Sequence, residues 1–200
     1  SVETGKGVIK YYDLTMRDTK PHGKLTVKEA FELSSNVGIS KIVVENFKDK
    51  PREFVDKLYR MNLNEKLNLE IIGEAAPLIK YPGDPSWSGV TLPQMSIGYE
   101  VKLTPLQILT FYNAVANDGK MVKPKFVKCI RYHGDTLKKF KPKVINSLIC
   151  SRQTLEKVKE ILEGVVENGT AKILKNDIYK IAGKTGTAQI AKNSSGYGSK

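Results

Sequence analysis

The sequence predicts an α+β fold, in which antiparallel strands pack with helices. Two observations carry this prediction. Several segments combine a helix start signal with apolar residues at helical spacing, and two alternating segments flank a Gly-containing turn, as in a hairpin. A mixture of long helices and antiparallel strands is typical of the α+β class.

The first part of the chain predicts strands followed by three helices. Residues 1–24 hold the run GVIKYYDLTM and then polar residues, so we expect strands and turns there. Thr26 and Glu29 form a T-x-x-E capping box, which indicates the start of a short helix. A second apolar helix is expected over residues 37–48, and a third in KPREFVDKLYRMN, where Pro51 falls near the first turn.

The middle of the chain predicts an irregular segment and then a helix. Residues 63–100 contain stretches rich in Pro and Gly, which usually run over a surface and often border a groove. Thr104, Pro105 and Gln107 supply an N-cap, a proline at the first helical position and a capping-box glutamine. The residues that follow are apolar on most faces, so we expect a central buried helix that ends at Gly119.

The last third predicts a basic hairpin, an amphipathic helix and a strand. KPKFVKCIRY and TLKKFKPKVI flank a turn at residues 133–135. Ser151 precedes apolar residues that recur on one side of a helix, which residues 168–169 are expected to end. In residues 179–184 the character of the residues alternates, which suggests a strand.

The composition is ordinary for a soluble globular domain, with 200 residues, 40% hydrophobic and 27% charged. The chain has no apolar run of membrane-spanning length and does not begin with Met, so any signal or anchor is expected outside it. The net charge is +12, with lysines over most of the chain and one dense run at residues 138–143. No nucleic-acid motif accompanies them, so we expect no nucleic-acid partner. We interpret the charge as a basic solvated surface, which could hold the protein near anionic polymers or lipid head groups.

The cysteines and histidines do not form a metal-binding pattern. Cys129 and Cys150 lack a CxxC spacing and are interpreted as small apolar core residues, with a single bridge between them left open. His22 and His133 lie in turn-like stretches, and no Cys/His cluster has zinc spacing. We therefore expect no transition-metal site.

The segment YKIAGKTGTAQIA (179–191) admits two interpretations. GKT (183–185) could end a Walker A loop, which requires a glycine five residues earlier and a helix directly afterwards. The required glycine position holds Ile178, and no helix signal follows the lysine. The nucleotide-binding interpretation therefore fails. KTG (184–186) could instead be the third motif of a serine acyl-transferase.

A second motif, SSN (34–36), precedes Lys184 by 150 residues counted from Ser34. Three longer stretches accompany the two motifs: LTVKEAFELSSNVG, SWSGVTLPQMSIGYEVKLTPLQILTFYNAVANDGKMVKP, and ENGTAKIL with YKIAGKTGTAQ. With them, nearly all of the chain resembles the transpeptidase domain of class B (monofunctional) penicillin-binding proteins, in particular the cell-division type. The resemblance implies a penicillin-binding protein/serine β-lactamase-like fold, with an antiparallel sheet packed with helices. Residues 1–200 would be a partial domain, incomplete at both ends.

The resemblance implies a catalytic role for three residues. Ser34 would relay a proton between the general base and the leaving amine. Asn36 would form a hydrogen bond with the acyl-donor peptide. Lys184 would place a positive charge near Ser34 and the substrate carboxylate. Two plainer alternatives stay open: Ser34 could cap the next helix, and Lys184 could be an ordinary exposed strand lysine.

The resemblance also implies substrate-binding roles after Lys184. Thr185 and Thr187 would offer hydroxyls to the substrate carboxylate, and Gly186 would leave room for a peptide alongside. The Thr187 N–H would form half of an oxyanion hole. The family's first motif, S-x-x-K, is absent, since no lysine has a serine three residues before it. We expect that motif before Ser1, so this fragment alone is expected not to be acylated.

The resemblance implies that the parent protein is a D,D-transpeptidase that cross-links peptidoglycan stem peptides through a serine acyl-enzyme. β-Lactams would act as substrate mimics, cell-division or glycosyltransferase membrane proteins would be partners, and no metal or organic cofactor is implied. The parent would be anchored in the inner membrane with this domain outside the cytoplasm. The alternatives are a β-lactam sensor or β-lactamase-like hydrolase, a non-catalytic relative that binds peptide or divisome partners, and an elongation-type role.

Overall fold

A computed structural model describes residues 1–187, 190–191 and 197–198 of the chain. Within these residues, six α-helices are combined with short strands, and every pair of strands is antiparallel. The predicted α+β class is confirmed. The strands are two to five residues long and pair two by two, so the described residues form six separate ladders and no continuous sheet.

The N-terminal part forms two ladders and three helices, as predicted. The strands are β1 (Val2–Glu3), β2 (Val8–Tyr11), β3 (Leu14–Arg17) and β4 (Lys24–Leu25), paired β1 with β4 and β2 with β3. The helices are α1 (Val27–Glu32), α2 (Asn36–Phe47) and α3 (Pro51–Arg60). The capping box of α1 is confirmed: the Glu29 N–H donates to Thr26 Oγ1 (3.1 Å) and the Thr26 N–H to Glu29 Oε2 (2.8 Å).

The segment 63–100 is largely irregular, as predicted, apart from one unpredicted short helix. Its elements, with the strand that follows, are β5 (Leu78–Ile79), α4 (Thr91–Ser96) and β6 (Val101–Lys102), and β5 pairs with β6. The N-cap of α4 is Val90, which makes no side-chain capping bond. No local signal therefore marks this helix, and burial of Leu92 and Met95 holds it in place.

The helix α5 (Pro105–Ala116) starts as predicted, with both hydrogen bonds of the Thr104–Gln107 capping box present. The prediction that it is buried on most faces is wrong. Ala114 is fully buried, whereas Ile108 is 44% and Leu109 62% exposed. Only the face that packs on the core of α6 and β7 is covered within the described residues, because an apolar sequence does not by itself provide a partner for each face.

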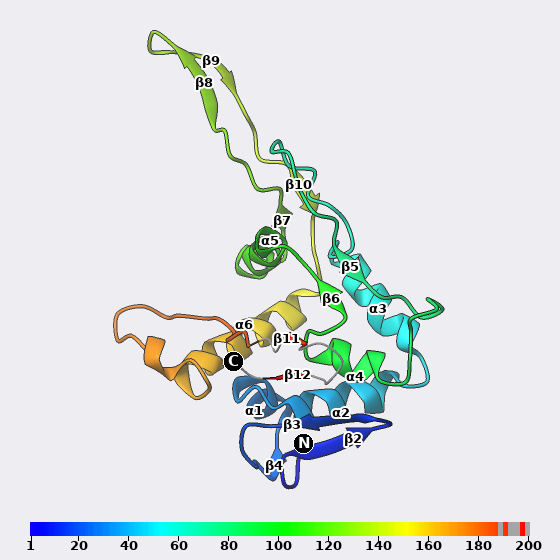
Figure 1. The fold of residues 1–200 in the computed structure, drawn as a ribbon. Helices are drawn as coiled ribbons and strands as arrows, with labels where there is room; N and C mark the ends of the chain where they lie inside the picture. Colours follow the sequence, from blue (N-terminus) through cyan, green and yellow to red (C-terminus); the bar gives the residue numbers. More distant parts are fainter. Residues whose placement is uncertain (188–189, 192–196, 199–200) are drawn as a thin grey trace.

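The remaining strands and helices complete the described chain. They are β7 (Met121–Val122), β8 (Cys129–Tyr132), β9 (Asp135–Lys139), β10 (Val144–Asn146), α6 (Arg152–Glu167), the 3₁₀ helix η1 (Lys172–Leu174), β11 (Ile190–Ala191) and β12 (Tyr197–Gly198). The basic hairpin is confirmed as β8 and β9, which stand clear of the helices in Figure 1. Its turn residues His133 and Gly134 have φ of 46° and 94°, as a tight two-residue hairpin turn requires.

The strand predicted over residues 179–184 is wrong. No strand is assigned there, and the backbone bond found in this segment runs from the Gly183 N–H to the Leu162 carbonyl of α6 (3.1 Å). Alternating residues suit an extended chain, but a strand also needs a neighbour for its ladder. The described strands pair elsewhere.

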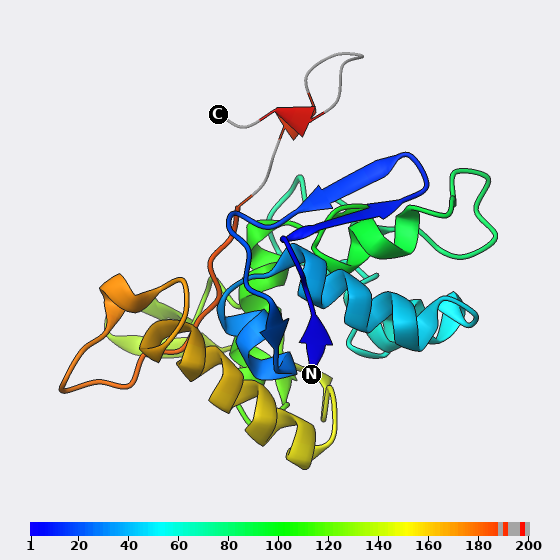
Figure 2. The ribbon, with the colours of Figure 1, turned by 90° about the horizontal axis from the view of Figure 1, so that it is seen from below.

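The core lies between α5, β7 and α6. The buried residues of its main cluster are Ala114, Val115, Met121, Ile149, Leu155 and Leu162. A neighbouring cluster joins Val165 and Val166 of α6 to Ala171, and Phe31 of α1 packs against both clusters. Figure 2 shows α1 lying beside α6 as a result. This contact brings the end of α1 close to the segment after α6.

Cys129 and Cys150 are both unbonded and half-buried, so they are neither bridged nor fully enclosed in the core. Among the described residues, no helix has both the length and the apolar character needed to cross a membrane.

Candidate active site around Ser34 and Lys184

Ser34 lies in the sharp connection between α1 and α2 and does not cap a helix. Its φ is 54°, which is uncommon for a residue other than glycine. The N-cap of α2 is Ser35, whose Oγ accepts from the Gly38 N–H (2.9 Å). The interpretation of Ser34 as a helix cap is therefore wrong, because Ser35 caps α2. Such a backbone conformation costs roughly 1–3 kcal/mol and persists only where its surroundings hold it.

Contacts from the end of β3 hold this connection. Asp18 accepts from the Ser35 hydroxyl (2.8 Å, Oδ2) and from the Val37 N–H (3.0 Å, Oδ1). The Asn36 side-chain amide donates to the Arg17 carbonyl (2.9 Å). Ser35 is 1% exposed, so the bonds to Asp18 are partly shielded from water, whereas the bond from Asn36 is exposed; together they fix the backbone next to Ser34.

Lys184 reaches Ser34 from the other end of the chain. Its Nζ donates to Ser34 Oγ at 2.5 Å and to the Thr185 carbonyl at 3.2 Å, and lies 5.7 Å from the centroid of the Phe31 ring. The side chain is half-buried, so the interpretation of Lys184 as an ordinary exposed lysine is wrong. Burial lowers the pKa of Lys184 below its ordinary value of 10.5, because the charged form loses hydration.

Thr170 completes the cluster of hydroxyl groups and was not predicted. Its Oγ1 lies 2.7 Å from Thr185 Oγ1, and both of these oxygens lie 3.4 Å from Ser34 Oγ. The Thr170 N–H donates to the Glu32 carbonyl (3.1 Å), which ties the segment after α6 to the end of α1. Nothing in the sequence marks a single threonine behind a helix as part of a site.

Two glycines allow α1 and α6 to approach this closely. A Cβ built on Gly169 would lie 2.2 Å from the Glu32 carbonyl oxygen, and one built on Gly164 would lie 1.8 Å from Glu32 Oε1. Glu32 is 3% exposed, so it has little room to give way. The backbone that carries Ser34 and the one that carries Thr170 are therefore in direct contact.

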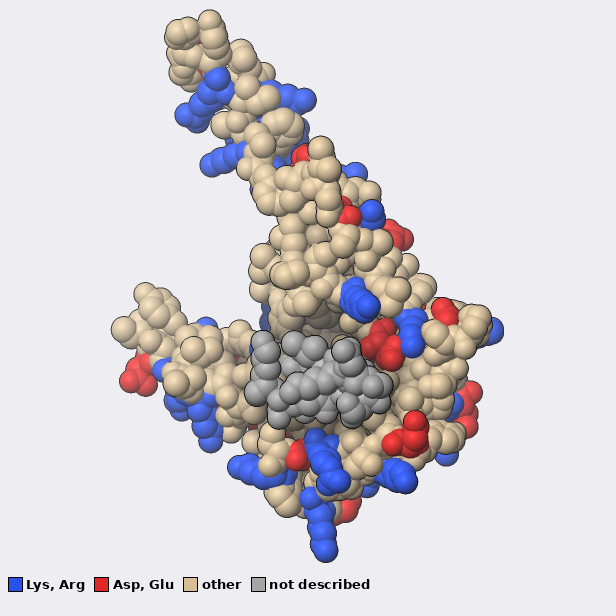
Figure 3. Space-filling model, viewed as in Figure 1, with Lys and Arg blue, Asp and Glu red and all other residues tan. Residues whose placement is uncertain are grey.

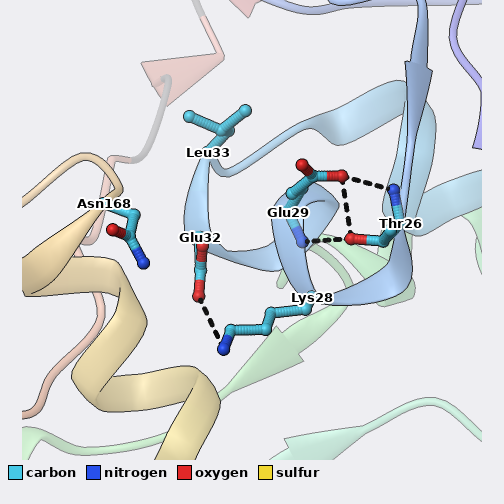
Figure 4. A pocket seen from close by; sticks show the side chains of 6 residues that line it. All are labelled: Thr26, Lys28, Glu29, Glu32, Leu33 and Asn168. Atoms are coloured by element: carbon cyan, nitrogen blue, oxygen red, sulfur yellow. Dashed lines mark hydrogen bonds and ion pairs between the residues drawn. The ribbon is translucent and has the colours of Figure 1, made fainter.

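A pocket of about 380 Å³ adjoins the Ser34 connection and opens beside Glu32. Figure 4 shows its lining, which consists of Thr26, Lys28, Glu29, Glu32, Leu33 and Asn168. Lys28 Nζ lies 3.9 Å from Glu32 Oε1 and 2.6 Å from Glu160 Oε1. The positive charge of Lys28 thus partly offsets the buried carboxylate of Glu32. The residues that line the pocket hold α1 in place beside Ser34 and are not themselves predicted site residues.

The predicted substrate-binding residues lie at the surface: Thr185 belongs to this cluster, and Gly186 and Thr187 follow it in the chain. Thr185, Gly186 and Thr187 are exposed, and nothing in the described chain lies within 4 Å of a Cβ built on Gly186. The roles of Asn36, Gly186 and Thr187 toward a peptide stay predictions. Within the described residues, no group of three His, Cys, Asp or Glu side chains is placed to hold a metal ion.

The arrangement suits proton transfer next to an anion site. An ammonium that donates to a serine oxygen directs the hydroxyl hydrogen of that serine away from the lysine, which leaves this hydrogen available to another acceptor. The same ammonium and the exposed threonine hydroxyls offer several donors to a carboxylate.

Comparisons with known proteins agree with this geometry. The profile of the penicillin binding protein transpeptidase domain matches residues 3–200. Penicillin-binding protein PbpB of Mycobacterium tuberculosis is 32% identical over 193 residues, covering 92% of this chain and 27% of that protein. Peptidoglycan D,D-transpeptidase FtsI of Escherichia coli is 28% identical over 177 residues, covering 87% of this chain and 27% of that protein.

Solved structures give the same result. The crystal structure of penicillin binding protein 3 from Mycobacterium tuberculosis has a TM-score of 0.80 and 31% identity, and the match covers 96% of this chain and 44% of that one. The same protein is described in complex with ampicillin and with aztreonam. The chain spans about a quarter of the length of the curated relatives named above. It belongs to the family of penicillin-binding protein transpeptidase domains.

Proposed function

We propose that this chain is part of a peptidoglycan D,D-transpeptidase of the class B, cell-division type. The single observation that carries the proposal is the hydrogen bond from Lys184 Nζ to Ser34 Oγ, which joins two motif residues 150 positions apart. The relatives named penicillin-binding protein PbpB and peptidoglycan D,D-transpeptidase FtsI support it. Residues 1–200 would form part of the transpeptidase domain, with the nucleophilic serine supplied before Ser1.

In the proposed reaction, the nucleophilic serine attacks the carbonyl carbon of the donor stem peptide. The C–N bond to the terminal residue breaks, the leaving nitrogen takes up a proton, and an acyl-enzyme ester remains. Ser34 passes its hydroxyl proton to that nitrogen and regains one from the general base. An amine of a second stem peptide then attacks the ester carbonyl and forms a new C–N bond, giving up a proton to the general base. The C–O bond to the serine breaks, and the serine oxygen takes a proton back from that base. Lys184 keeps Ser34 oriented for the proton transfer through their hydrogen bond.

The terminal carboxylate of the donor would bind beside Lys184. The lysine supplies the positive charge, and Thr185 and Thr187 supply hydroxyl donors. Asn36 would form a hydrogen bond with the donor peptide, and Gly186 would leave room for this peptide. The Thr187 N–H would stabilise the oxyanion, a contact whose loss costs about 3 kcal/mol in other acyl-transfer enzymes.

β-Lactams would acylate the same serine, because their strained amide replaces the scissile peptide bond. The descriptions of the related penicillin binding protein 3 with ampicillin and with aztreonam support this proposal. Peptidoglycan is cross-linked outside the cytoplasm. The parent protein would therefore be anchored in the inner membrane with this domain on the extracytoplasmic side, near cell-division or glycosyltransferase membrane proteins.

The test is intact mass of the full-length protein after incubation with benzylpenicillin, with Lys184→Ala as the control. We expect a persistent adduct of one penicillin, formed much more slowly in the control. An adduct that hydrolyses quickly would assign the protein to the β-lactamase-like hydrolases. A full-length sequence without a nucleophilic serine would leave only the non-catalytic, peptide-binding alternative.

A further inference from the structure

Most of the net charge of the protein is concentrated in one projecting segment. Residues 120–143, which we name the basic arm, contain nine Lys or Arg and a single Asp, a net charge of +8 out of +12 for the chain. The arm comprises β7, β8 and β9. Figure 3 shows Lys and Arg side chains in blue along the part of the molecule that projects from the body. Since like charges repel and attract the opposite charge, so dense a cluster favours an anionic partner.

The described chain provides little compensation. Of the cationic groups of the basic arm, Lys123 forms an ion pair, with Glu70 at 3.2 Å, and it is the one that does so within the described residues. Lys138 instead lies 5.0 Å from the Phe140 ring centroid, and Lys125 donates to the Phe140 carbonyl. Lys128 and Arg131 are exposed. The positive charge therefore faces solvent.

Apolar side chains alternate with these charges. The exposed fractions of the largest are 53% for Phe126, 48% for Val127, 47% for Ile130, 64% for Tyr132 and 66% for Leu137. An isolated two-stranded ribbon has no core of its own in which to bury them. The arm thus presents cationic and apolar side chains together, which suits a partner that offers both anionic groups and hydrocarbon.

The charges lie on both faces of the ribbon. The strand register pairs Ile130 with Lys138 and Cys129 with Lys139, and paired residues share a face, whereas adjacent residues point to opposite faces. Lys138 and Lys139 therefore lie on opposite faces. A flat acidic protein would cover only one of these faces, whereas a layer of lipid head groups can surround both.

A pocket at the base of the ribbon has the same mixed character. Its volume is about 250 Å³, and it is lined by Lys123, Pro124, Lys125, Val127, Phe140, Lys141 and Lys143, together with Glu70, whose carboxylate pairs with Lys123 and leaves the other three lysines uncompensated within the described residues. Several ammonium groups beside an aromatic ring and an aliphatic side chain suit a phosphate that is attached to an apolar chain. We propose that the basic arm docks on an anionic phospholipid bilayer and that this pocket accepts a phospholipid head group.

The test is sedimentation of the full-length protein, with any membrane anchor removed, in the presence of vesicles of phosphatidylcholine alone or mixed with phosphatidylglycerol. The arm variant carries Lys128→Gln, Arg131→Gln, Lys141→Gln and Lys143→Gln. The matched control carries Lys48→Gln, Lys57→Gln, Lys66→Gln and Lys157→Gln, which remove the same charge from exposed positions outside the arm. Each cationic group near an anionic surface is worth about five-fold in affinity, so the arm variant should bind anionic vesicles about 100-fold or more weakly. The control should stay close to the wild type.

A third variant, Tyr132→Ser with Leu137→Ser, tests whether the exposed apolar side chains of the basic arm contribute to vesicle binding. We expect weaker binding to anionic vesicles and unchanged binding to soluble poly-glutamate. Equal losses in the arm variant and its matched control would show that only the total charge matters and would overturn the proposal. Unchanged vesicle binding by the third variant, together with tight binding of poly-glutamate, would assign the arm to an acidic polymer or protein. Equal binding to neutral vesicles would also contradict the proposal.

Discussion

At the scale of single residues, the candidate site is a group of hydroxyls that meet around one ammonium. Ser34 Oγ accepts from Lys184 Nζ at 2.5 Å, and the hydroxyls of Thr170 and Thr185 lie 3.4 Å from it. The Ser34 backbone is held at a φ of 54°, so its side chain faces Lys184 while Ser35 caps the helix. Each group therefore depends on the orientation of its neighbours.

Thr170 is expected to act by positioning Thr185 and Ser34. The variant Thr170→Val has nearly the same shape but loses the hydroxyl that contacts Thr185 and Ser34. The shorter of these hydrogen bonds is worth about 1 kcal/mol, which corresponds to about five-fold in rate. We expect acylation of the full-length protein by benzylpenicillin to slow by about that factor, and the free energy of unfolding to fall by no more than about 1 kcal/mol. Thr170→Ser should restore the rate. A wild-type rate in Thr170→Val would contradict this role.

The lowered pKa of Lys184 predicts the pH dependence of acylation. Burial favours the neutral amine, so the ammonium is lost as pH rises through a value below the ordinary 10.5. The acylation rate should therefore fall on the alkaline side before an exposed lysine would titrate. The free energy of unfolding changes with pH in the opposite direction. It rises with pH between the lowered pKa of Lys184 in the folded state and its pKa in the unfolded state, because the unfolded state binds more protons in this range.

The measurement is the acylation rate against pH, for the wild type and for Lys184→Arg. Arginine stays charged throughout this range, so the variant, although slower, should lack the alkaline fall. The same alkaline fall in both proteins would assign the titration to another group.

The motif residues could be predicted from the sequence, whereas their setting could not. Ser34 and Lys184 stand in short motifs whose order and spacing are visible along the chain. Thr170 is 136 residues from Ser34, and only the fold brings the two together. That Ser35 and not Ser34 caps α2 also depends on one backbone torsion angle, which neighbouring residue types do not determine.

At the scale of elements, the site exists because α1 and α6 touch. Gly169 lies against the Glu32 carbonyl, and Thr170 follows it directly. The capping boxes of α1 and α5 and the hairpin turn could be predicted because their signals are local. The partial burial of α5 and the lack of a strand in residues 179–184 could not be predicted, since both depend on which other segments lie alongside.

Gly169→Ala should separate the two elements. The new Cβ would lie 2.2 Å from the Glu32 carbonyl oxygen and 2.9 Å from that of Val165, so backbone must move. We expect the free energy of unfolding to fall by about 1–3 kcal/mol, as overpacking typically costs. Acylation should slow as well, because Thr170 shifts.

Gly183→Ala is the matched control for this prediction. Nothing in the described chain lies within 4 Å of a Cβ built there, and its φ is not positive, so stability should hardly change. Urea unfolding of the two variants compares them directly. Equal stability of Gly169→Ala and Gly183→Ala would show that the contact between α1 and α6 is looser than described.

At the scale of the whole molecule, the chemistry and the charge lie in different regions. The site lies where α1, α2 and the segment after α6 meet, whereas the basic arm projects from the far side of α5 (Figure 1). The sequence shows the dense basic run, but not that residues 120–143 project from the body, which becomes visible only when β8 and β9 pair. The family of the chain could be predicted, because the motifs and their long flanking stretches match together.

The central claim is that Ser34 and Lys184 act as one unit, and a double-mutant cycle tests it most directly. The measured quantity is the rate constant for acylation of the full-length protein by benzylpenicillin, in the wild type, Ser34→Ala, Lys184→Ala and the double variant. Each single change should slow acylation by about 100-fold or more, as the loss of a group in acid–base catalysis does. The double variant should be no slower than the slower single one. Effects that multiply would show that the two residues act independently and would contradict the account.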